Sequence, residues 1–220
     1  IAAGAHGELV VVWQDARFGG GTRDGIAFSR SQDGGLTWST PARINRDATV
    51  QAFTPSVAIR ADGIIAVTYY DFRSNTSDAA TLPTDYWITR STDGETWRES
   101  RVAGPFDLAT APNAQGLFLG DYQSLVAIGS VFVPFYVATN DRNIGNRTDV
   151  FASLVSSAGA TAGPKRAQAA DVMRAAPAEA MAVTPELRRK LDESAVRTLE
   201  RRTPGRPSAT GGGPALRSGG

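Results

Sequence analysis

Hydrophobic positions in the first part of the chain come in short runs that are rich in β-branched and aromatic residues. The runs are Glu8–Asp15, Gly25–Arg30, Pro55–Arg60, Ile64–Asp71, Asp85–Arg90, Ser124–Gly129 and Val131–Thr139. Gly, Asp, Asn and Pro separate them, which is typical of β-strands joined by turns. Since no long segment with a 3.6-residue period lies between the runs, the pattern predicts an all-β body.

These runs repeat along the chain. An alignment of residues 10–38 with residues 65–97 pairs Asp15 with Asp71, Arg17 with Arg73, Asp24 with Asp85, Ser31 with Ser91 and Trp38 with Trp97. A third copy runs over residues 118–155 and carries Asp149 in the place of Asp24 and Asp85. Four antiparallel strands per repeat, at a spacing of about 56–60 residues, are typical of a β-propeller blade. We therefore expect a partial β-propeller of about two and a half four-stranded antiparallel blades in residues 1–155.

The rest of the chain has a different composition. All Phe, Tyr and Trp residues lie in residues 1–155, so the body is expected to end near Ser156. Residues 156–183 read as an Ala/Gly-rich linker and residues 204–220 as a disordered tail. Residues 184–203 read as an amphipathic helix, with Thr184 as N-cap and Pro185 at the first helical position. Its apolar stripe consists of Leu187, Leu191, Val196 and Leu199.

Charge and composition exclude several function classes. Residues 1–155 carry 12 Arg, no Lys and 16 acidic residues, a net charge of −4, which disfavours a nucleic-acid partner. The chain has no Cys, so disulfides and thiolate metal sites are excluded, and we expect no metal and no cofactor. No apolar run approaches the ~20 residues of a membrane-spanning helix. The chain begins almost directly in a strand, so we interpret it as part of a secreted or cell-surface protein whose export signal would lie upstream.

A polar turn that ends in tryptophan occurs twice. The first copy contains Ser31, Asp33, Gly35, Thr37 and Trp38, and the second contains Ser91, Asp93, Gly94, Thr96 and Trp97. The first copy matches the Asp-box, Ser-x-Asp-x-Gly-x-Thr-Trp, of sialidase-like propellers, and the second resembles a version one residue shorter. Residues 1–155 thus resemble a sialidase-like (exo-α-sialidase-type, BNR-repeat) β-propeller. The whole chain is similar to the C-terminal portion of such a bacterial protein.

We interpret the Asp-boxes as structural. Their Asp side chains can accept hydrogen bonds from turn N–H groups, their Gly residues permit positive φ, and their Trp side chains can fill space between layers. Antiparallel connections alternate between the two ends of a sheet. The Asp-boxes should therefore share one end with the turn at residues 61–63, whereas the long loop at residues 71–84 lies at the opposite end, where function is expected.

That opposite end carries the candidate site residues. An Asp-x-Arg pair follows a strand in each of the first two repeats: Asp15 with Arg17, and Asp71 with Arg73. The third repeat departs from the pattern and offers Asp141, Arg142 and Arg147, with Asp121 and Tyr122 before its first strand. Arginine forks bind carboxylates in a bidentate manner, so this set predicts a site for an acidic sugar.

The resemblance to sialidases implies a role for each candidate. Arg17, Arg73 and Arg142 would bind the substrate carboxylate as a triad, with Arg147 as a further binding residue. Tyr122 would be the nucleophile, and Asp15, Asp71 or Asp121 the general acid. The alternative is that each Asp-x-Arg pair is a local salt bridge that holds its own loop.

Other features count against a working sialidase. The Phe/Tyr-Arg-Ile-Pro motif of the family's first blade is absent from this chain, and the body has only Glu8, Glu95 and Glu99. We expect none of these three to partner a tyrosine at the Asp-x-Arg end. Three functions stay open: a glycoside hydrolase fragment acting on sialic-acid-type glycans, a non-catalytic propeller that binds glycan or protein, and a scaffold. The expected partners are a glycan or glycoconjugate and the missing propeller blades.

Overall fold

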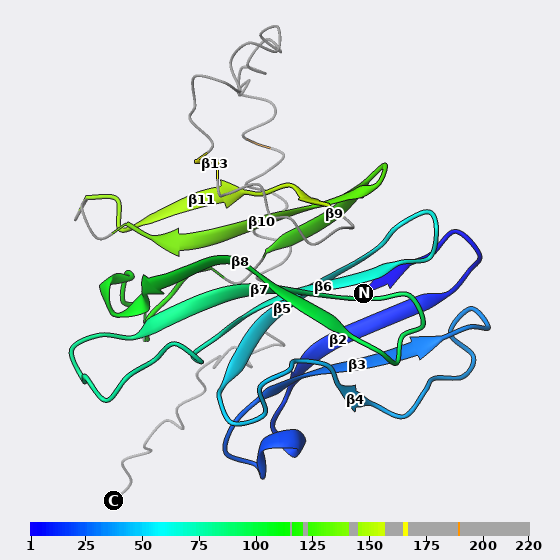
Figure 1. The fold of residues 1–220 in the computed structure, drawn as a ribbon, viewed down its shortest axis with the longest axis horizontal. Helices are drawn as coiled ribbons and strands as arrows, with labels where there is room; N and C mark the ends of the chain where they lie inside the picture. Colours follow the sequence, from blue (N-terminus) through cyan, green and yellow to red (C-terminus); the bar gives the residue numbers. More distant parts are fainter. Residues whose placement is uncertain (115, 121–122, 141–144, 157–164, 167–188, 190–220) are drawn as a thin grey trace, which may run out of the picture. The chain divides into compact units, whose positions relative to one another are not determined.

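The structure is a computed structural model that describes residues 1–114, 116–120, 123–140, 145–156, 165–166 and 189 (Figure 1). The described residues form three antiparallel β-sheets with two short 3-10 helices, so the predicted all-β body is confirmed. The three described sheets do not close into a ring, and the propeller stays a prediction.

The first two repeats each form a four-stranded sheet in which every strand pairs with its neighbours in sequence. The first sheet contains β1 (Ala2–Ala3), β2 (Leu9–Asp15), β3 (Gly25–Ser31) and β4 (Ala42–Arg43). The second contains β5 (Ala52–Ile59), β6 (Ile65–Asp71), β7 (Pro83–Ser91) and β8 (Arg98–Asp107). The 3-10 helices η1 (Ala16–Gly19) and η2 (Leu108–Thr110) follow β2 and β8. Short turns between consecutive runs favour this sequential pairing.

The third repeat forms a five-stranded sheet. Its strands are β9 (Ser124–Ile128), β10 (Val131–Thr139), β11 (Thr148–Ala152), β12 (Val155–Ser156) and β13 (Lys165–Arg166). Strands β11 and β12 pair with the same strand, β10, and β13 adds to the free edge of β11. The structure thus differs from the predicted linker over 156–183. A sheet edge offers unpaired backbone groups, and Lys165 and Arg166 satisfy some of them.

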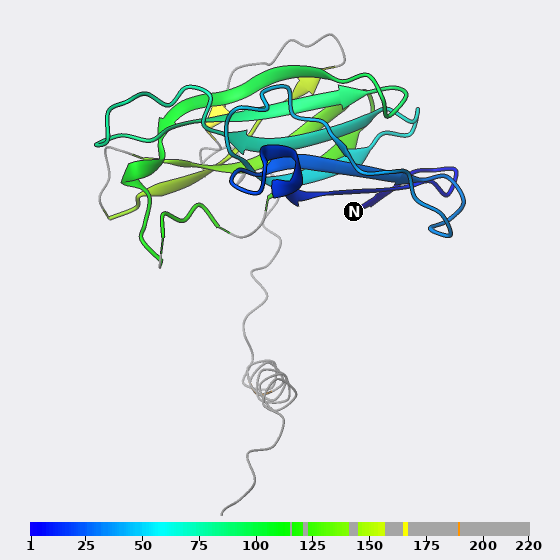
Figure 2. The ribbon, with the colours of Figure 1, turned by 90° about the horizontal axis from the view of Figure 1, so that it is seen from below.

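The second sheet lies between the other two, as Figures 1 and 2 show. Alternate side chains of β6 point to opposite faces of the sheet. Val67 and Tyr69 pack in the core against the first sheet, whereas Tyr70 packs in the core against the third. In the core between the second and third sheets, the Tyr70 and Tyr86 ring centroids lie 4.7 Å apart, and those of Tyr86 and Tyr136 lie 4.4 Å apart.

The two polar turns that resemble Asp-boxes, for which we keep that name, form the tied turns that the sequence predicts. In the first, the Thr37 N–H donates to Asp33 Oδ1 at 2.9 Å and the Gly35 N–H donates to Ser31 Oγ at 2.8 Å. Gly35 has a φ of 95°, which favours glycine. Ser91, Asp93, Gly94 and Thr96 repeat these features in the second box. The carboxylates accept several hydrogen bonds, which lowers the pKa of Asp33 to about 2 and holds that of Asp93 below its usual range.

The two Asp-box tryptophans differ in burial. Trp97 packs against the core between the first two sheets, with its ring centroid 5.0 Å from that of Phe28. Trp38 is 42% exposed, so the prediction that both fill space between layers is wrong for this residue. Its indole N–H donates to the carbonyl of Gly35 within the same turn at 3.1 Å. The first Asp-box has no preceding sheet among the described residues that could cover this ring.

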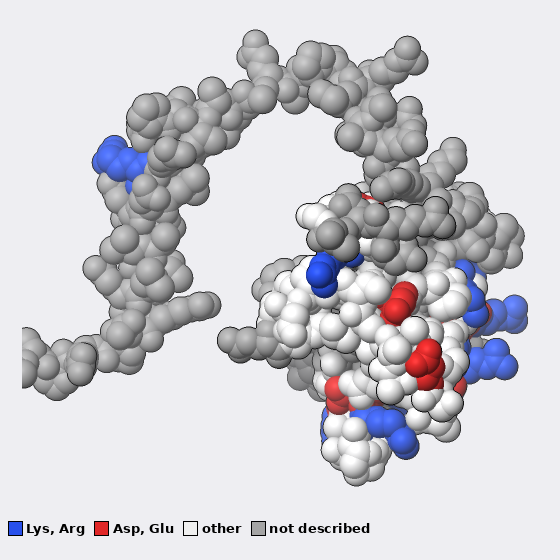
Figure 3. All heavy atoms as spheres, turned by 90° about the vertical axis from the view of Figure 1, so that its left-hand side faces the viewer, with Lys and Arg blue, Asp and Glu red and all other residues white. Residues whose placement is uncertain are grey.

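Several predictions fall outside the described residues. The helix over 184–203 is described only at Arg189, which is helical, and the tail over 204–220 is not described. Among the described residues, no helix is long and apolar enough to cross a membrane. Figure 3 shows basic and acidic side chains interspersed on one described face of the body.

Candidate functional site

Strand registers place the Asp-x-Arg motifs at one end of the sheets and the Asp-boxes at the other. Asp71 pairs with Asp85 at one end of β6, while Ile65 pairs with both Ile59 and Ser91 at the other. This agrees with the predicted division of the two ends. The repeat alignment needs one correction. Asp15 pairs with Gly25, so Gly25 rather than Asp24 is the structural equivalent of Asp85, because the Asp24 alignment is out of register by one residue.

The first Asp-x-Arg pair forms a local clamp. Arg17 Nε donates to both carboxylate oxygens of Asp15 at 2.9 Å, and Arg17 Nη2 forms an ion pair with the same carboxylate. The Trp13 indole and the Arg17 backbone N–H also donate to Asp15. These contacts hold the pKa of Asp15 well below its usual range. Asp15 is therefore an ionised residue that caps η1 and is a poor general acid.

The second Asp-x-Arg pair is buried and has further partners. Asp71 is fully buried and accepts hydrogen bonds from Arg73 Nε at 2.7 Å and from the Trp87 indole at 3.0 Å. Arg73 also lies over the Trp87 ring, 3.7 Å from its centroid, a cation–π geometry. Burial raises the pKa of Asp71, against the opposing effect of Arg73. The arrangement holds the Asp71 carboxylate in place and leaves little of it accessible to a ligand.

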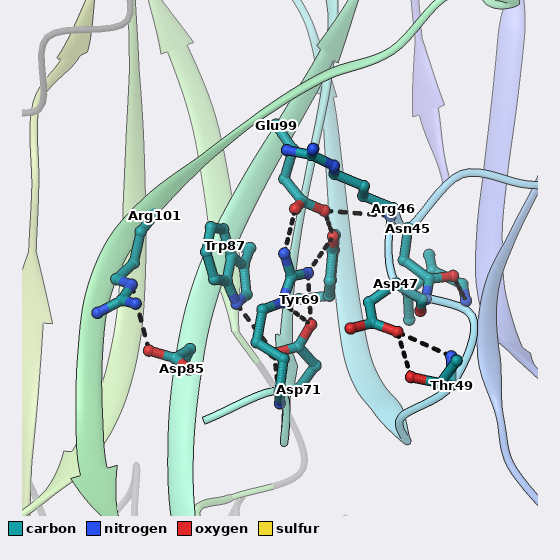
Figure 4. Close-up of polar contacts among 12 residues, drawn as sticks. Asn45, Arg46, Asp47, Thr49, Tyr69, Asp71, Asp85, Trp87, Glu99 and Arg101 are labelled. Atoms are coloured by element: carbon teal, nitrogen blue, oxygen red, sulfur yellow. Dashed lines mark hydrogen bonds and ion pairs between the residues drawn. The ribbon is translucent and has the colours of Figure 1, made fainter. Parts of the chain in front are cut away.

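Glu99 joins this pair to a tyrosine, which corrects an expectation from the sequence (Figure 4). The Tyr69 hydroxyl donates to Glu99 Oε1, and Arg73 Nη1 donates to Glu99 Oε2 at 2.5 Å. The register of β8 makes this possible: Glu99 pairs with Thr89 on β7, one position along the face from Trp87, so its side chain reaches across the sheet to Tyr69. Period-two alternation could have placed Tyr69 with Asp71 on one face, but the sequence does not show which residue of β8 pairs with Thr89.

The environment of Glu99 is buried. Burial raises the pKa of Glu99 to about 7, although a hydrogen bond from the Arg46 backbone N–H and the charge of Arg46 favour its charged form. Arg73 forms an ion pair with the same carboxylate. Tyr69 is 0% exposed, so no substrate atom can contact its hydroxyl in this structure. Tyr69, Asp71, Arg73, Trp87 and Glu99 therefore form one polar cluster that joins β6, β7 and β8 of the second sheet, and we call it the buried bracket.

An open hollow of about 470 Å³ lies beside this bracket. Arg46, Asp47, Thr49 and Arg73 line it. Asp47 accepts hydrogen bonds from the backbone and hydroxyl of Thr49 at 2.8 and 2.7 Å, which lowers its pKa and fixes the loop between the first two sheets. Both acidic and basic side chains line this hollow, so its charge does not favour an anionic ligand.

A second hollow, of about 450 Å³, brings segments of three repeats together at the Asp-x-Arg end. Its lining comes from Val12–Gln14 of the first repeat, Phe53–Pro55 of the second and Leu117–Gly120 of the third, with Leu108. We call it the three-repeat hollow. One polar contact at this hollow joins the first two repeats: Gln14 Oε1 accepts a hydrogen bond from the Thr54 N–H at 3.0 Å.

The backbone at Thr54 is unusual. Thr54 has a φ of 50° in a region where the β5–β6 register shifts, and its carbonyl accepts a hydrogen bond from the Gln123 side-chain amide. A non-glycine residue with positive φ beside a bulge is a feature of functional sites. Sequence reasoning missed this position. Pro55 is compatible with a bulge, but it also suits the start of a strand, where the sequence analysis placed it.

Not all predicted site residues can be compared with the structure. Asp121, Tyr122 and Arg142 lie outside the described residues, although Asp121 directly follows Gly120 of the three-repeat hollow in sequence. Arg147 is exposed, and its carbonyl accepts a hydrogen bond from the Asn140 N–H at 2.7 Å. Of the predicted arginine triad, the two described members are each bonded to the aspartate of their own motif. Among the described residues, no cluster of three His, Asp or Glu side chains could hold a metal ion.

No protein-family model and no curated protein matches the chain. A crystal structure of a protein of unknown function from Dyadobacter fermentans is 19% identical with a TM-score of 0.47, and the match covers 74% of this chain and 51% of that one. Zg3597, a family 117 glycoside hydrolase from the marine bacterium Zobellia galactanivorans, is 12% identical with a TM-score of 0.34, over 60% of this chain and 38% of that one. The chain thus spans about half the length of the first of these proteins and less than half the length of the second.

Proposed function

We propose that this chain is part of a sialidase-like Asp-box propeller that recognises glycans through the three-repeat hollow. The observation that supports this proposal is that segments of three consecutive repeats line one cavity at the Asp-x-Arg end. In a propeller, successive blades surround a central channel. Further blades would complete both the ring and the site.

The lining of the hollow suits a sugar. Phe118 is 39% exposed there and offers an apolar ring face, while the Gln14 amide and the Thr54 backbone supply fixed hydrogen-bonding groups. Its volume of about 450 Å³ lies in the usual range of small-molecule sites, ~300–1,000 Å³. Sialic-acid-type sugars are the first class to test because of the Asp-box resemblance.

Recognition is favoured over hydrolysis by the described residues. The Asp15 carboxylate is held ionised by Arg17, and the Tyr69 hydroxyl is inaccessible, so neither provides a general acid or a nucleophile. Hydrolysis is the second candidate function. It would depend on Asp121 and Tyr122, which continue the chain from Gly120 at the wall of the hollow.

The test is a pair of matched variants in glycan binding. Phe118→Ala should weaken binding on a glycan array and in titration calorimetry by at least fivefold, because the ring face is removed. Phe135→Ala is the control: Phe135 is similarly exposed, at 42%, but lies on the third sheet outside the hollow. Equal loss in both variants, or no glycan binding by the folded chain, would overturn recognition at the hollow.

A hydrolysis assay separates the two candidate functions. Turnover of a fluorogenic sialoside that falls by orders of magnitude in Tyr122→Phe would assign catalysis to this chain. Glycan binding without turnover would leave a binding propeller.

A further inference from the structure

A third hollow lies at the opposite, Asp-box end, between the second and third sheets. Its volume is about 320 Å³, and three arginines line it: Arg60, Arg90 and Arg98. Ile64 provides an apolar wall, and Asp93 also lines the hollow. Phe132 is 0% exposed and lies under the Arg60 guanidinium, 5.7 Å from the ring centroid. This site is separate from the three-repeat hollow and does not rest on the proposed function.

The three arginines line one hollow although their like charges repel each other. Arg90 on β7 pairs directly with Arg98 on β8, and like charges at paired positions of a ladder repel each other. The charge of Arg60 adds to this repulsion: together with burial it lowers the pKa of Arg90. The fold therefore gathers positive charge at a place where it costs stability.

The hydrogen bonds of Arg90 go to uncharged partners. Its Nη1 donates to the Ser156 carbonyl at 2.7 Å and its Nη2 to Ser100 Oγ at 3.3 Å. Arg60 is paired with Asp62 at 2.6 Å, and the Asp93 carboxylate accepts hydrogen bonds from its own turn. Among the described residues, no carboxylate forms an ion pair with Arg90 or Arg98, and residues 157–164, which follow Ser156, contain no acid.

The first repeat shows which counter-ion the second repeat lacks. There, Arg30 is the equivalent of Arg90, since each precedes the first serine of its Asp-box. Arg30 is neutralised by Glu8, with Nη2 and Oε2 2.7 Å apart. The same registers make Ile64 the equivalent of Glu8, so the second repeat has an apolar residue where the first has the counter-ion.

We propose that this hollow binds an oxyanion group, a sulfate or a carboxylate, carried on a monosaccharide. Guanidinium groups bind such oxyanions with several hydrogen bonds. The negative charge of the ligand would take the place of a carboxylate such as Glu8, which the second repeat lacks because it has Ile64 at the equivalent position. The apolar wall of Ile64 suits the carbon skeleton of a sugar better than it suits a free inorganic ion. The volume suits one small ring, at the lower end of the range for ligand sites.

The test restores the missing counter-ion. Galactose 6-sulfate is titrated into the full chain at constant ionic strength, with binding followed by calorimetry. Ile64→Glu should weaken binding at least tenfold, because the new carboxylate neutralises Arg90 as Glu8 neutralises Arg30. Ile64→Gln, which matches the size without the charge, should change binding less than threefold.

Further arms keep the outcome decisive. Inorganic sulfate should bind at least fivefold more weakly than galactose 6-sulfate, and equal affinity would overturn the saccharide part of the proposal. If Ile64→Glu does not fold, Arg98→Gln on the exposed end of β8 takes its place, with an expected loss of at least fivefold. Equal binding by the wild type and the charge-altered variant, or no binding by the wild type, would overturn the site itself.

Discussion

At the scale of single residues, Glu99 differs most from what its position in the sequence suggests. Glu99 lies two residues after Trp97, the last residue of the second Asp-box. Its carboxylate nevertheless accepts hydrogen bonds from both Tyr69 and Arg73 in the buried bracket. Its carboxyl is the part of the bracket that titrates near neutral pH.

The raised pKa of Glu99 predicts a pH-dependent stability. Between pH ~4.5 and about 7 the folded state binds a proton that the unfolded state has lost, so the free energy of unfolding falls as pH rises through this window. Glu99→Gln removes this proton linkage. Relative to that variant, the wild type should lose roughly 1–2 kcal/mol between pH 5 and pH 8, after allowance for solvent screening.

Urea unfolding at both pH values measures this difference. Glu95→Gln is the control, because Glu95 is exposed in the neighbouring turn. A stability difference between wild type and Glu99→Gln that does not vary with pH would contradict the assignment of a raised pKa to Glu99.

At the scale of elements, strands and Asp-boxes could be predicted from the sequence, because both depend on local signals. Alternation of apolar residues sets a strand, and the Ser, Asp and Gly spacing sets a tied turn. The position of β13 and the bulge at Thr54 could not be predicted, since each depends on a sheet edge or a partner distant in sequence. The buried bracket could not be predicted either, because its residues come from β6 and the loop after it, from β7 and from β8, and no single sequence motif connects these segments.

Ser91 holds the second Asp-box together. Its buried hydroxyl accepts hydrogen bonds from the Gly94 and Asp93 N–H groups and donates to the Asp93 carboxylate. Ser91→Ala leaves these groups without their partner and should lower the free energy of unfolding by about 1–2 kcal/mol. Thr92→Ala, at the next, exposed position, should change it by less than ~0.5 kcal/mol. Thermal unfolding of both variants checks the prediction, and similar effects would refute it.

At the scale of the whole molecule, the third sheet leaves an apolar face exposed. Val126, Ile128, Phe135 and Val150 are 36–62% exposed, and the registers of β9, β10 and β11 place them on one face. The corresponding face of the second sheet is covered by the third sheet's core residues. A further blade, as the propeller proposal requires, would cover this face in the same way.

This exposed face predicts dye binding by the 220-residue chain. Replacing Ile128 and Val150 together by Asn should reduce the fluorescence of bound anilinonaphthalene sulfonate to less than half. The free energy of unfolding should change by less than ~1 kcal/mol, because both residues are mostly exposed at 60% and 62%. Unchanged fluorescence in a folded double variant would show that the dye binds elsewhere.

In the first two sheets, every strand pairs with its neighbour in sequence. Such pairing keeps the strand ladders within one repeat, so each of these sheets can complete its own backbone hydrogen bonds without a later part of the chain. During synthesis, the first sheet can form while the second is still in the ribosome, and each completed sheet then offers an apolar surface on which the next can assemble. A chain of this design would be built in the order in which it is translated, one repeat at a time.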